Sequence, residues 1–309
     1  MKNGIVYVVS ADAYLYAIDA LTGEKRWAFD TLAGMHQMAK RHPSEPVKQG
    51  GVIYVTNWPF HQMRAPHKSY LYAIDVDSGL PKWTFSVDGN GITKPTIASD
   101  AVFFSVYSEK EPLARLSAVD AVSGKMKWEF QAERGYSQHS PAMVASNIVY
   151  FATDKGLFAL EPNTGNKRWS FSSGDEISIN FQVDDRFVYV VDHERSVMGV
   201  KDTLHALDLS TGQERWSYTP GGIFGGSRIW INALHDGVLY MTGRVHLDAI
   251  DAATGKKLWS FKTGTSISSK TLMFNGMIFV TSQTTTTLGQ EPDQGYLYAI
   301  DAKTGKLRP

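Results

Sequence analysis

Short apolar runs alternate with turn signals along the whole chain. The first clear unit is residues 15–29, where Leu-x-Ala-Ile is followed by an acid, two residues, Thr-Gly, three residues and Trp-x-Phe. The same pattern recurs with small changes, and its first residue stands at Leu15, Leu71, Leu116, Leu157, Leu204, Leu247 and Leu297. Self-similarity of this kind is the sequence mark of a repeat architecture.

The spacing and the local chemistry of the repeat together predict β-structure. The acids of successive copies are 41 to 56 residues apart, which fits either four-stranded propeller blades or two-helix solenoid repeats. Alternating apolar positions on both sides of a Gly-bearing turn are a hairpin signal. The acid can accept backbone N–H groups within the turn, and the glycine supplies a positive φ angle. No stretch carries a sustained apolar stripe at helical spacing.

Each copy is preceded by further strand-like segments. Runs rich in Val, Ile and aromatic residues begin at Gly4, Gly51, Ala101, Asn147, Arg186, Gly237 and Gly276. Six of these runs follow another short segment, so a full repeat contains four strands, named A to D in chain order. We therefore predict an all-β fold, a β-propeller of four-stranded antiparallel blades that forms a single domain over residues 1–309.

The strand inventory also sets the expected number of blades. There are seven B and seven C segments, but six A and six D segments, because the first copy has no A segment and the seventh copy has no Trp. Seven blades are the main prediction, with eight as the alternative if the sequence is a fragment. An unpaired strand at an incomplete blade would favour association with another chain.

Composition narrows the classes of function. The 309 residues include 31 basic and 31 acidic residues, so no general attraction to nucleic acid is expected. No apolar run is long enough for a transmembrane segment, and the first predicted strand starts at Gly4, so we expect no signal peptide. The absence of cysteine suits an oxidising compartment, and we expect a periplasmic or extracellular location rather than a cytoplasmic one.

The repeated phrase resembles the repeat of the pyrroloquinoline-quinone (PQQ)-like propeller superfamily, over essentially the whole chain. That superfamily includes quinone-dependent dehydrogenases, the propeller lipoprotein of the outer-membrane assembly machinery, and sensor domains of bacterial kinases, so the resemblance specifies a fold and not an activity. It implies that the repeat tryptophans dock neighbouring blades. The matching residues, predicted to be structural, are Trp27, Trp83, Trp128, Trp169, Trp216 and Trp259.

Most of the variable chain is expected on one face of the propeller. Long B–C connections are predicted at residues 57–70, 107–115, 192–203 and 282–295, and long D–A connections at 30–45 and 219–227. Insertions on one face of a repeat array usually mark the binding face. The predicted partner-binding residues there are Met35, Met38, Trp58, Phe60, His61 and Met63. The alternative is that these loops bury the residues against each other. The histidines of this region match no metal motif, so no metal is predicted.

A second candidate site lies at the starts of the innermost strands, where this superfamily places its ligands. The predicted ligand-binding residues are Lys48, Gln49, Lys94, His139, Ser140, Asn180, Gln182, Arg228, Trp230 and Lys270. Four of them are cations, and no carboxylate stands at a matching position. Convergent cations favour an anionic small molecule or an acidic peptide segment. The alternative is an ordinary hydrated polar lining.

The resemblance also raises an enzymatic alternative. A PQQ- and calcium-dependent dehydrogenase would need carboxylate and amide ligands, for which Asn180 could supply an amide and Trp230 a stacking ring. The nearest carboxylates in sequence are Asp175 and Glu176, and the adjacent-cysteine disulfide of the alcohol-oxidising members is absent. We therefore predict no catalytic residue and no cofactor. The expected function is a non-enzymatic scaffold or sensor propeller that binds a protein partner or an anionic ligand, with the dehydrogenase as alternative.

Overall fold

The computed structural model describes residues 4–32, 41–59, 68–89, 91–107, 113–133, 140–174, 176–196, 199–220, 228–243, 245–267, 271–283 and 295–308. These residues form two compact units, Met1–Ser170 and Phe171–Pro309, and each unit is described separately. All regular structure within the described ranges is β-strand. The same ranges contain no helix long and apolar enough to span a bilayer.

The first unit contains seventeen of the strands, counted over the described residues. They are β1 (Ile5–Val9), β2 (Tyr14–Asp19), β3 (Lys25–Asp30), β4 (Arg41–Pro43), β5 (Val47–Gln49), β6 (Val52–Pro59), β7 (Lys68–Asp75), β8 (Pro81–Asp88), β9 (Gly91–Ile92), β10 (Thr96–Ala98), β11 (Ala101–Tyr107), β12 (Leu113–Asp120), β13 (Met126–Glu133), β14 (Met143–Ala145), β15 (Ile148–Thr153), β16 (Gly156–Leu160) and β17 (Lys167–Phe171, whose last residue belongs to the second unit).

The remaining strands belong to the second unit. They are β18 (Glu176–Ile177), β19 (Gln182–Val183), β20 (Phe187–Ser196), β21 (Gly199–Asp208), β22 (Glu214–Tyr218), β23 (Trp230–His235), β24 (Val238–Thr242), β25 (His246–Asp251), β26 (Lys257–Lys262), β27 (Ser266–Ile267), β28 (Leu272–Phe274), β29 (Met277–Gln283) and β30 (Gly295–Asp301).

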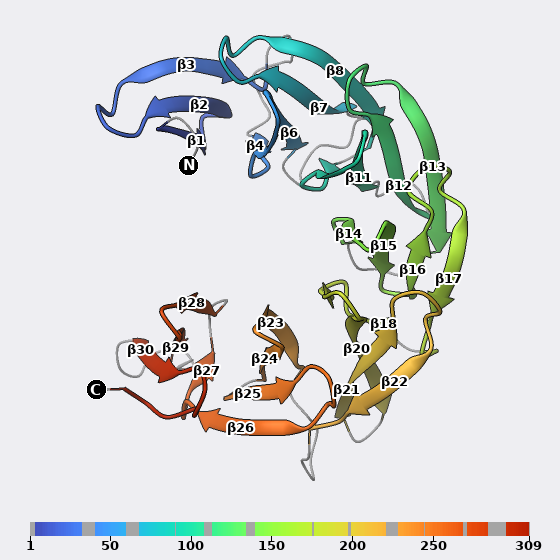
Figure 1. Cartoon of the computed structure of the whole chain (residues 1–309), viewed down its shortest axis with the longest axis vertical. Coiled ribbons are helices and arrows are strands. Elements are labelled where there is room, and N and C mark those ends of the chain that lie inside the picture. Colours follow the sequence, from blue (N-terminus) through green and yellow to red (C-terminus); the bar gives the residue numbers. More distant parts are fainter. Residues whose placement is uncertain are drawn as a thin grey trace, which may run out of the picture. The chain divides into compact units, whose positions relative to one another are not determined.

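The strands pair into seven antiparallel sheets within the described residues, and each sheet is one blade (Figure 1). Blade 1 is β1–β3, blade 2 β4–β8, blade 3 β9–β13, blade 4 β14–β17, blade 5 β18–β22, blade 6 β23–β26 and blade 7 β27–β30. Neighbouring strands follow the predicted order A to D. The predicted all-β propeller of four-stranded blades is therefore confirmed.

The aspartate of six repeats closes the C–D turn with its side chain, whereas the Glu161 carboxylate of blade 4 pairs with Arg168. In blade 1, Oδ1 of Asp19 accepts the backbone N–H groups of Leu21 and Thr22 at 3.0 and 3.1 Å, and its other oxygen pairs with Arg26. The hydrogen bond from the Arg26 guanidinium is the main cause that holds the pKa of Asp19 at about 2. The turn glycine, Gly23, has a φ of 73° and bonds back to the Asp19 carbonyl. The Asp19 side chain and the backbone hydrogen bond of Gly23 thus fix the same turn.

The repeat tryptophan explains why the glycine of the turn recurs. A Cβ placed on Gly79 in blade 2 would lie 2.6 Å from Cδ2 of Trp27, which comes from blade 1. The indole N–H of Trp27 donates to the Val76 carbonyl at 3.1 Å, beside the same turn. The other glycine and tryptophan pairs with this geometry are Gly124 with Trp83, Gly165 with Trp128, Gly255 with Trp216, and Gly305 with Trp259. Within each unit, therefore, the indole of one blade lies on the turn glycine of the next.

A second aromatic residue supports each indole. The middle residue of strand B packs against the tryptophan of its own blade, as with Tyr54 and Trp83, whose ring centroids are 5.9 Å apart. The Tyr54 hydroxyl and the Trp83 indole both donate to the Ala121 carbonyl of the following blade. Blade 5 is an exception. The Tyr189 hydroxyl donates to the Ala252 carbonyl, but Nε1 of Trp216 is buried without a hydrogen-bond partner among the described residues.

Strand A is divided into two pieces in blades 2, 3, 5 and 7, which the sequence did not indicate. In blade 3, β9 and β10 pair with opposite ends of β11, and Thr93 lies between them. The Thr93 N–H donates to the Ser105 carbonyl at 2.9 Å, while its hydroxyl accepts the Ser105 N–H at 3.0 Å. A side-chain oxygen thus replaces the missing backbone acceptor. Ser44 and Ser140 make the same pair of bonds to Thr56 and Ala152.

One predicted loop is a pair of strands instead. Residues 192–203, expected as a B–C connection, continue β20 and β21 to ten residues each, with Asp192 opposite Thr203 and Ser196 opposite Gly199. The long-loop prediction for blade 5 was therefore wrong. The cause is the strongly polar composition of this hairpin, in which the polar residues pair with one another across the strands.

A first prediction concerns the glycine under the indole. Gly124→Ala and Gly23→Ala both place a methyl group at a φ near 70°, since the measured angles are 68° and 73°. Both changes cost about 1 kcal/mol of backbone strain. Only Gly124→Ala also collides with an indole, because no described atom lies within 4 Å of the Cβ position at Gly23. We expect Gly124→Ala to lose about 1–3 kcal/mol more free energy of unfolding, measured by urea titration. Equal losses in both variants would contradict the docking role of Trp83.

Candidate functional site

The predicted partner-binding loops lie almost entirely outside the described residues. Met35, Met38, Phe60, His61 and Met63 are not among them. Trp58 belongs to β6, where its backbone pairs with His42, but its side chain is not described. The role of this set as a partner surface therefore stays a prediction.

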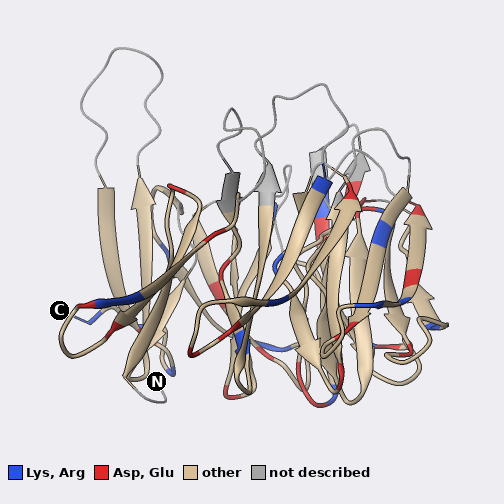
Figure 2. Cartoon of the chain, turned by 90° about the horizontal axis from the view of Figure 1, so that it is seen from above, with Lys and Arg blue, Asp and Glu red and all other residues tan. Residues whose placement is uncertain are grey.

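The predicted channel residues of the first unit do not form a cluster of free cations. Nζ of Lys94 pairs with Oε2 of Glu45 at 2.7 Å, and Nζ of Lys48 lies over the Tyr7 ring at 5.3 Å from its centre. Ser140 is buried, and its hydroxyl accepts the Ala152 N–H. Gln49 is exposed at the end of β5, and His139 lies outside the described residues. Basic and acidic residues are interspersed over the described chain (Figure 2).

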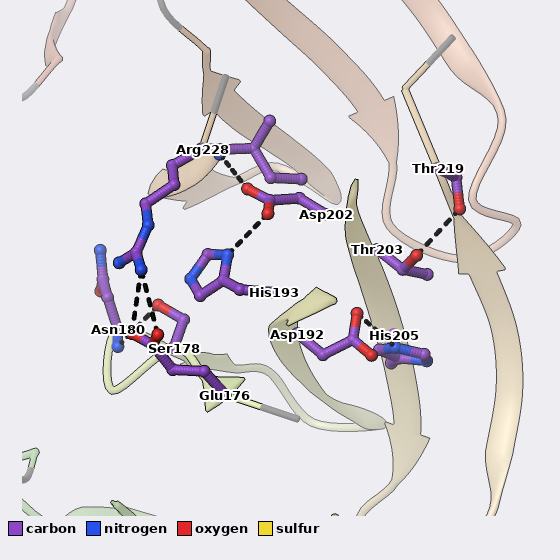
Figure 3. Close-up of polar contacts among 11 residues, drawn as sticks. Glu176, Ser178, Asn180, Asp192, His193, Asp202, Thr203, His205, Thr219 and Arg228 are labelled. Carbon is purple, nitrogen blue, oxygen red and sulfur yellow. Dashed lines mark hydrogen bonds and ion pairs between the residues drawn. The ribbon is translucent and has the colours of Figure 1, made fainter. Parts of the chain in front are cut away.

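In the second unit, the predicted residues gather where blades 5 and 6 meet. Nη2 of Arg228 donates to both oxygens of Glu176 at 3.2 and 3.0 Å (Figure 3). Asn180 lies in the break between β18 and β19, and Gln182 is half-buried in β19. Lys270 lies outside the described residues. The expectation of cations without matching carboxylates is therefore wrong for Lys94 and Arg228, and an anionic small-molecule site is not supported.

Trp230 is an exposed aromatic residue on a fixed backbone. It begins β23 and is 41% exposed, whereas Ile229 and Ile231 on either side are buried. The Ile229 N–H donates to Oδ2 of Asp202 at 2.5 Å, and the Ile231 carbonyl accepts Nδ2 of Asn180 at 2.9 Å. Side chains from blade 5 thus hold the backbone of blade 6 on both sides of the indole, so its position is set before any partner binds.

A buried histidine–aspartate pair supports this arrangement. His193 and Asp202 face each other across β20 and β21, and Nδ1 of His193 lies 2.7 Å from Oδ1 of Asp202 (Figure 3). Their side chains are 1% and 2% exposed. The imidazole also lies beside the Trp230 ring, with 6.4 Å between ring centres. One carboxylate therefore orients the histidine with one oxygen and the Ile229 backbone with the other.

A second polar group, formed by His205 and two carboxylates, lies in the same blade. Nε2 of His205 is 3.3 Å from Oδ1 of Asp192, and Nδ1 is 2.6 Å from Oε2 of Glu214. Burial acts to lower the pKa of His205, but the bonds to the two carboxylates outweigh it and raise that pKa above its ordinary value. The same contact holds the pKa of Asp192 below its usual range despite burial. Nδ1 is bonded to Glu214 and Nε2 lies in ion-pair distance of Asp192, so both carboxylates favour the charged form of His205.

The residues that might hold calcium and PQQ do not assemble a site in the described part of the chain. Asn180 offers an amide oxygen, but its amide nitrogen is bonded to blade 6. The Glu176 carboxylate is engaged by Arg228. No group of three or more His, Asp or Glu residues in the described ranges is arranged to hold a metal ion. The donors among the described residues therefore do not fit that cofactor, and Asp175 lies outside those residues.

Sequence reasoning missed the residues that determine this geometry. Glu45, His193 and Asp202 were not singled out, and Glu176 was named only as a carboxylate near a possible calcium site. Glu45 and Glu176 neutralise two of the predicted cations. A usable signal existed for the histidine pair. The pairing of Phe187 with Asp208 fixes the register of the hairpin, and continuing it by six residues brings His193 opposite Asp202. Glu45 and Glu176 are far in sequence from Lys94 and Arg228, the cations that they pair with. The sequence carried no comparable signal for these two pairings.

The charged His205 predicts a pH dependence of stability. A histidine whose folded pKa is raised contributes stability that is complete below its unfolded pKa and is lost as pH rises through the folded value. We expect the urea midpoint of the wild type to fall as the pH rises above about 6.5, the ordinary pKa of histidine, and this fall to be reduced in His205→Gln. His235→Gln is the control, because His235 is exposed beside Asp236. An unchanged pH profile in His205→Gln would rule out the charged histidine as its cause.

Curated relatives share the repeats at low identity. The outer membrane protein assembly factor BamB of Yersinia pestis is 25% identical over 207 residues, which cover 63% of this chain and 48% of that protein. A 1-butanol dehydrogenase (quinone) of Thauera butanivorans is 29% identical over 127 residues, which cover 37% of this chain and 20% of that protein. The chain thus spans less than half the length of either relative.

Solved structures show the same fold. The quinohemoprotein alcohol dehydrogenase of Comamonas testosteroni matches with a TM-score of 0.66 at 16% identity, over 99% of this chain and 66% of that one. At that identity the likeness concerns the fold alone. The family model described as outer membrane protein assembly factor BamB matches residues 11–182 and 200–308, which is most of the sequence. The chain therefore belongs to the family of BamB-type repeat propellers.

Proposed function

We propose that this chain is a non-enzymatic binding propeller, a scaffold or sensor domain that recognises a protein partner, with Trp230 as a contact residue. The observation that carries the proposal is the exposed indole whose backbone is held on both sides by Asp202 and Asn180. Tryptophan is enriched among residues that dominate binding energy at protein interfaces. A preset position lowers the entropy lost on binding.

The charges around Trp230 favour a protein partner over an anionic ligand. Glu176 neutralises Arg228 through two hydrogen bonds, and the His193–Asp202 pair is almost fully buried. The indole is therefore surrounded by polar groups that already have partners. An aromatic centre within such a rim is typical of protein interfaces. The partner is expected to place an apolar or aromatic side chain on the Trp230 ring.

Family membership supports a scaffold role and an extracytoplasmic location. The Yersinia relative is named as a factor of outer membrane protein assembly, which takes place in the cell envelope. We propose the same compartment for this chain, which agrees with the absence of cysteine. The predicted loop set around Trp58 and Met63 belongs to the same proposal as a second contact region.

Site-specific crosslinking tests the partner surface. Trp230 is replaced by the photoreactive residue benzoylphenylalanine and irradiated in envelope extract from the source cells. We expect one discrete protein adduct, identified by mass spectrometry and lost when excess unmodified protein competes. Trp230→Ala is expected to weaken that complex on the order of thirtyfold, the effect of an interface hot spot of about 2 kcal/mol. Leu258, which is 53% exposed on β26, is the matched control position. The same adducts from both positions would contradict the proposal.

A PQQ- and calcium-dependent dehydrogenase is the second candidate, favoured by the similarity to the quinone-dependent butanol dehydrogenase. The discriminating measurement is a PQQ titration of the full chain with and without calcium, followed by tryptophan fluorescence and dye-linked alcohol oxidation. Because the Glu176 carboxylate is engaged by Arg228, we expect no calcium-dependent saturation and no turnover. Calcium-dependent quenching with turnover would replace the scaffold proposal by the enzymatic one.

A further inference from the structure

Positive charge is unevenly distributed among the C–D turns, each taken from its acid to the residue before the tryptophan position. In blades 1 to 5 these segments carry no net charge taken together; they are residues 19–26, 75–82, 120–127, 161–168 and 208–215. In blades 6 and 7, residues 251–258 and 301–308 together carry an excess of three positive charges. The chain as a whole is neutral, so this excess is a local feature of two neighbouring blades.

The excess charge comes from lysines without an acidic partner. In blade 1 the residue before the tryptophan, Arg26, neutralises the turn acid Asp19 at 2.7 Å. Arg308 pairs with Asp301 in the same way in blade 7. Four further basic residues of these two turns are exposed and form no ion pair with a carboxylate of the described residues, namely Lys256, Lys257, Lys303 and Lys306.

Two exposed leucines lie among these lysines. Leu258 directly precedes the tryptophan of blade 6 and is 53% exposed, and Leu307, one position earlier in the repeat of blade 7, is 55% exposed. The position of Leu258 is basic in every other blade, where it is Arg26, Lys82, Lys127, Arg168, Arg215 or Arg308. Blade packing therefore does not require an apolar residue there, and the leucine adds apolar surface that the fold does not use.

The two turns lie side by side in the second unit. A Cβ placed on Gly305 would be 2.5 Å from Cδ2 of Trp259, and the Trp259 indole donates to the Ala302 carbonyl at 3.0 Å. The turn of blade 7 thus packs on the residue that directly follows Leu258. We call the resulting surface the basic rim, which consists of Lys256, Lys257, Leu258, Lys303, Lys306 and Leu307.

The exposure of the basic rim does not require an open blade face. The residue two places before the tryptophan position is exposed in every blade of the described chain; these residues are Lys25, Pro81, Met126, Lys167, Glu214, Lys257 and Leu307. Lys25, Pro81 and Glu214 stay exposed although the turn glycine of the next blade packs on the indole beside them. A neighbouring blade therefore leaves this position in contact with solvent.

We propose that the basic rim binds the surface of a lipid bilayer that contains anionic phospholipids. Lysines near such a surface are attracted by the negative charge of the headgroups. Leucines next to lysines can enter the boundary between headgroups and acyl chains, which supplies an apolar contribution as well. Leu258 and Leu307 stand beside hairpin turns, so a flat surface can reach both, and this favours a bilayer over an acidic protein segment.

This inference is independent of the proposed function at Trp230. Trp230 begins β23, and its backbone is held by Asp202 and Asn180 of blade 5, none of which belongs to the basic rim. Failure of lipid binding would leave the protein partner of Trp230 untouched, and the reverse also holds.

Vesicle sedimentation tests the lipid contact. The full chain is mixed with vesicles of three parts phosphatidylcholine and one part phosphatidylglycerol, and the bound fraction is measured against lipid concentration. We expect saturable binding to these vesicles, no binding to vesicles of phosphatidylcholine alone, and weaker binding at high salt because salt screens the lysines. No binding to the mixed vesicles at low salt would overturn the proposal.

A pair of lysine substitutions locates the contact. Lys257→Gln combined with Lys306→Gln is expected to weaken vesicle binding on the order of twentyfold, since each lysine near an anionic surface contributes about fivefold. The matched control is Lys125→Gln combined with Lys167→Gln. These lysines occupy the same two repeat positions in blades 3 and 4, are exposed, and change the net charge equally. Equal losses in both pairs would overturn the proposal, because binding would then follow net charge alone.

A leucine substitution separates a bilayer from a purely electrostatic contact. Leu307→Ser is expected to weaken binding to the mixed vesicles on the order of fivefold, because a partly inserted leucine loses part of the gain of full burial. Met126→Ser is the control at the same repeat position of blade 3, where the side chain is 43% exposed, and is expected to bind like the wild type. Vesicle binding that Leu307→Ser leaves unchanged would overturn the proposal in favour of an acidic protein segment as the occupant.

Discussion

The contact between an indole and a turn glycine is the constraint on which the rest of the structure depends. A blade of three or four short strands has two apolar faces and cannot bury both by itself. Trp27, Trp83 and their equivalents join one face to the next blade by ring packing and a hydrogen bond to a carbonyl beside the turn. The glycine is needed because any Cβ would occupy the place of the ring. Thus one residue pair sets the distance between blades.

The other repeated residues make this contact reproducible. The acid fixes the turn that presents the glycine, and the aromatic residue of strand B supports the ring from its own blade. Because each blade is built the same way, residues that differ between blades can serve recognition without disturbing the fold. Blade 5 shows the extent of that freedom. Its hairpin carries His193, Asp202 and His205, and two of these support the backbone or ring of Trp230.

The fold could be predicted from the sequence because its signal is repeated seven times, so that local ambiguity in one copy is resolved by the others. The candidate site could not be predicted to the same degree. Lys94 and Arg228 meet Glu45 and Glu176 only because the divided strands A of blades 2 and 5 place these carboxylates beside the next blade. Such contacts occur once each and leave no periodic trace. The polar part of the blade 5 hairpin, residues 192–203, resembled a loop for the same reason, since its alternation is visible only when both strands are read together.

The hydroxyl groups that replace a carbonyl in strand A have a consequence for solubility. Strand A is one of the two edge strands of each complete blade, and a continuous edge would offer a ladder of free N–H and C=O groups to any unfolded chain. Thr93, Ser44 and Ser140 turn the backbone at that point, and Pro95, Pro46 and Pro141 follow them closely without an N–H to donate. In blades 2, 3 and 4 this edge is thereby reduced to pieces of two or three residues, too short to template a further strand. These blades thus keep an open strand A edge while limiting its capacity to nucleate aggregation.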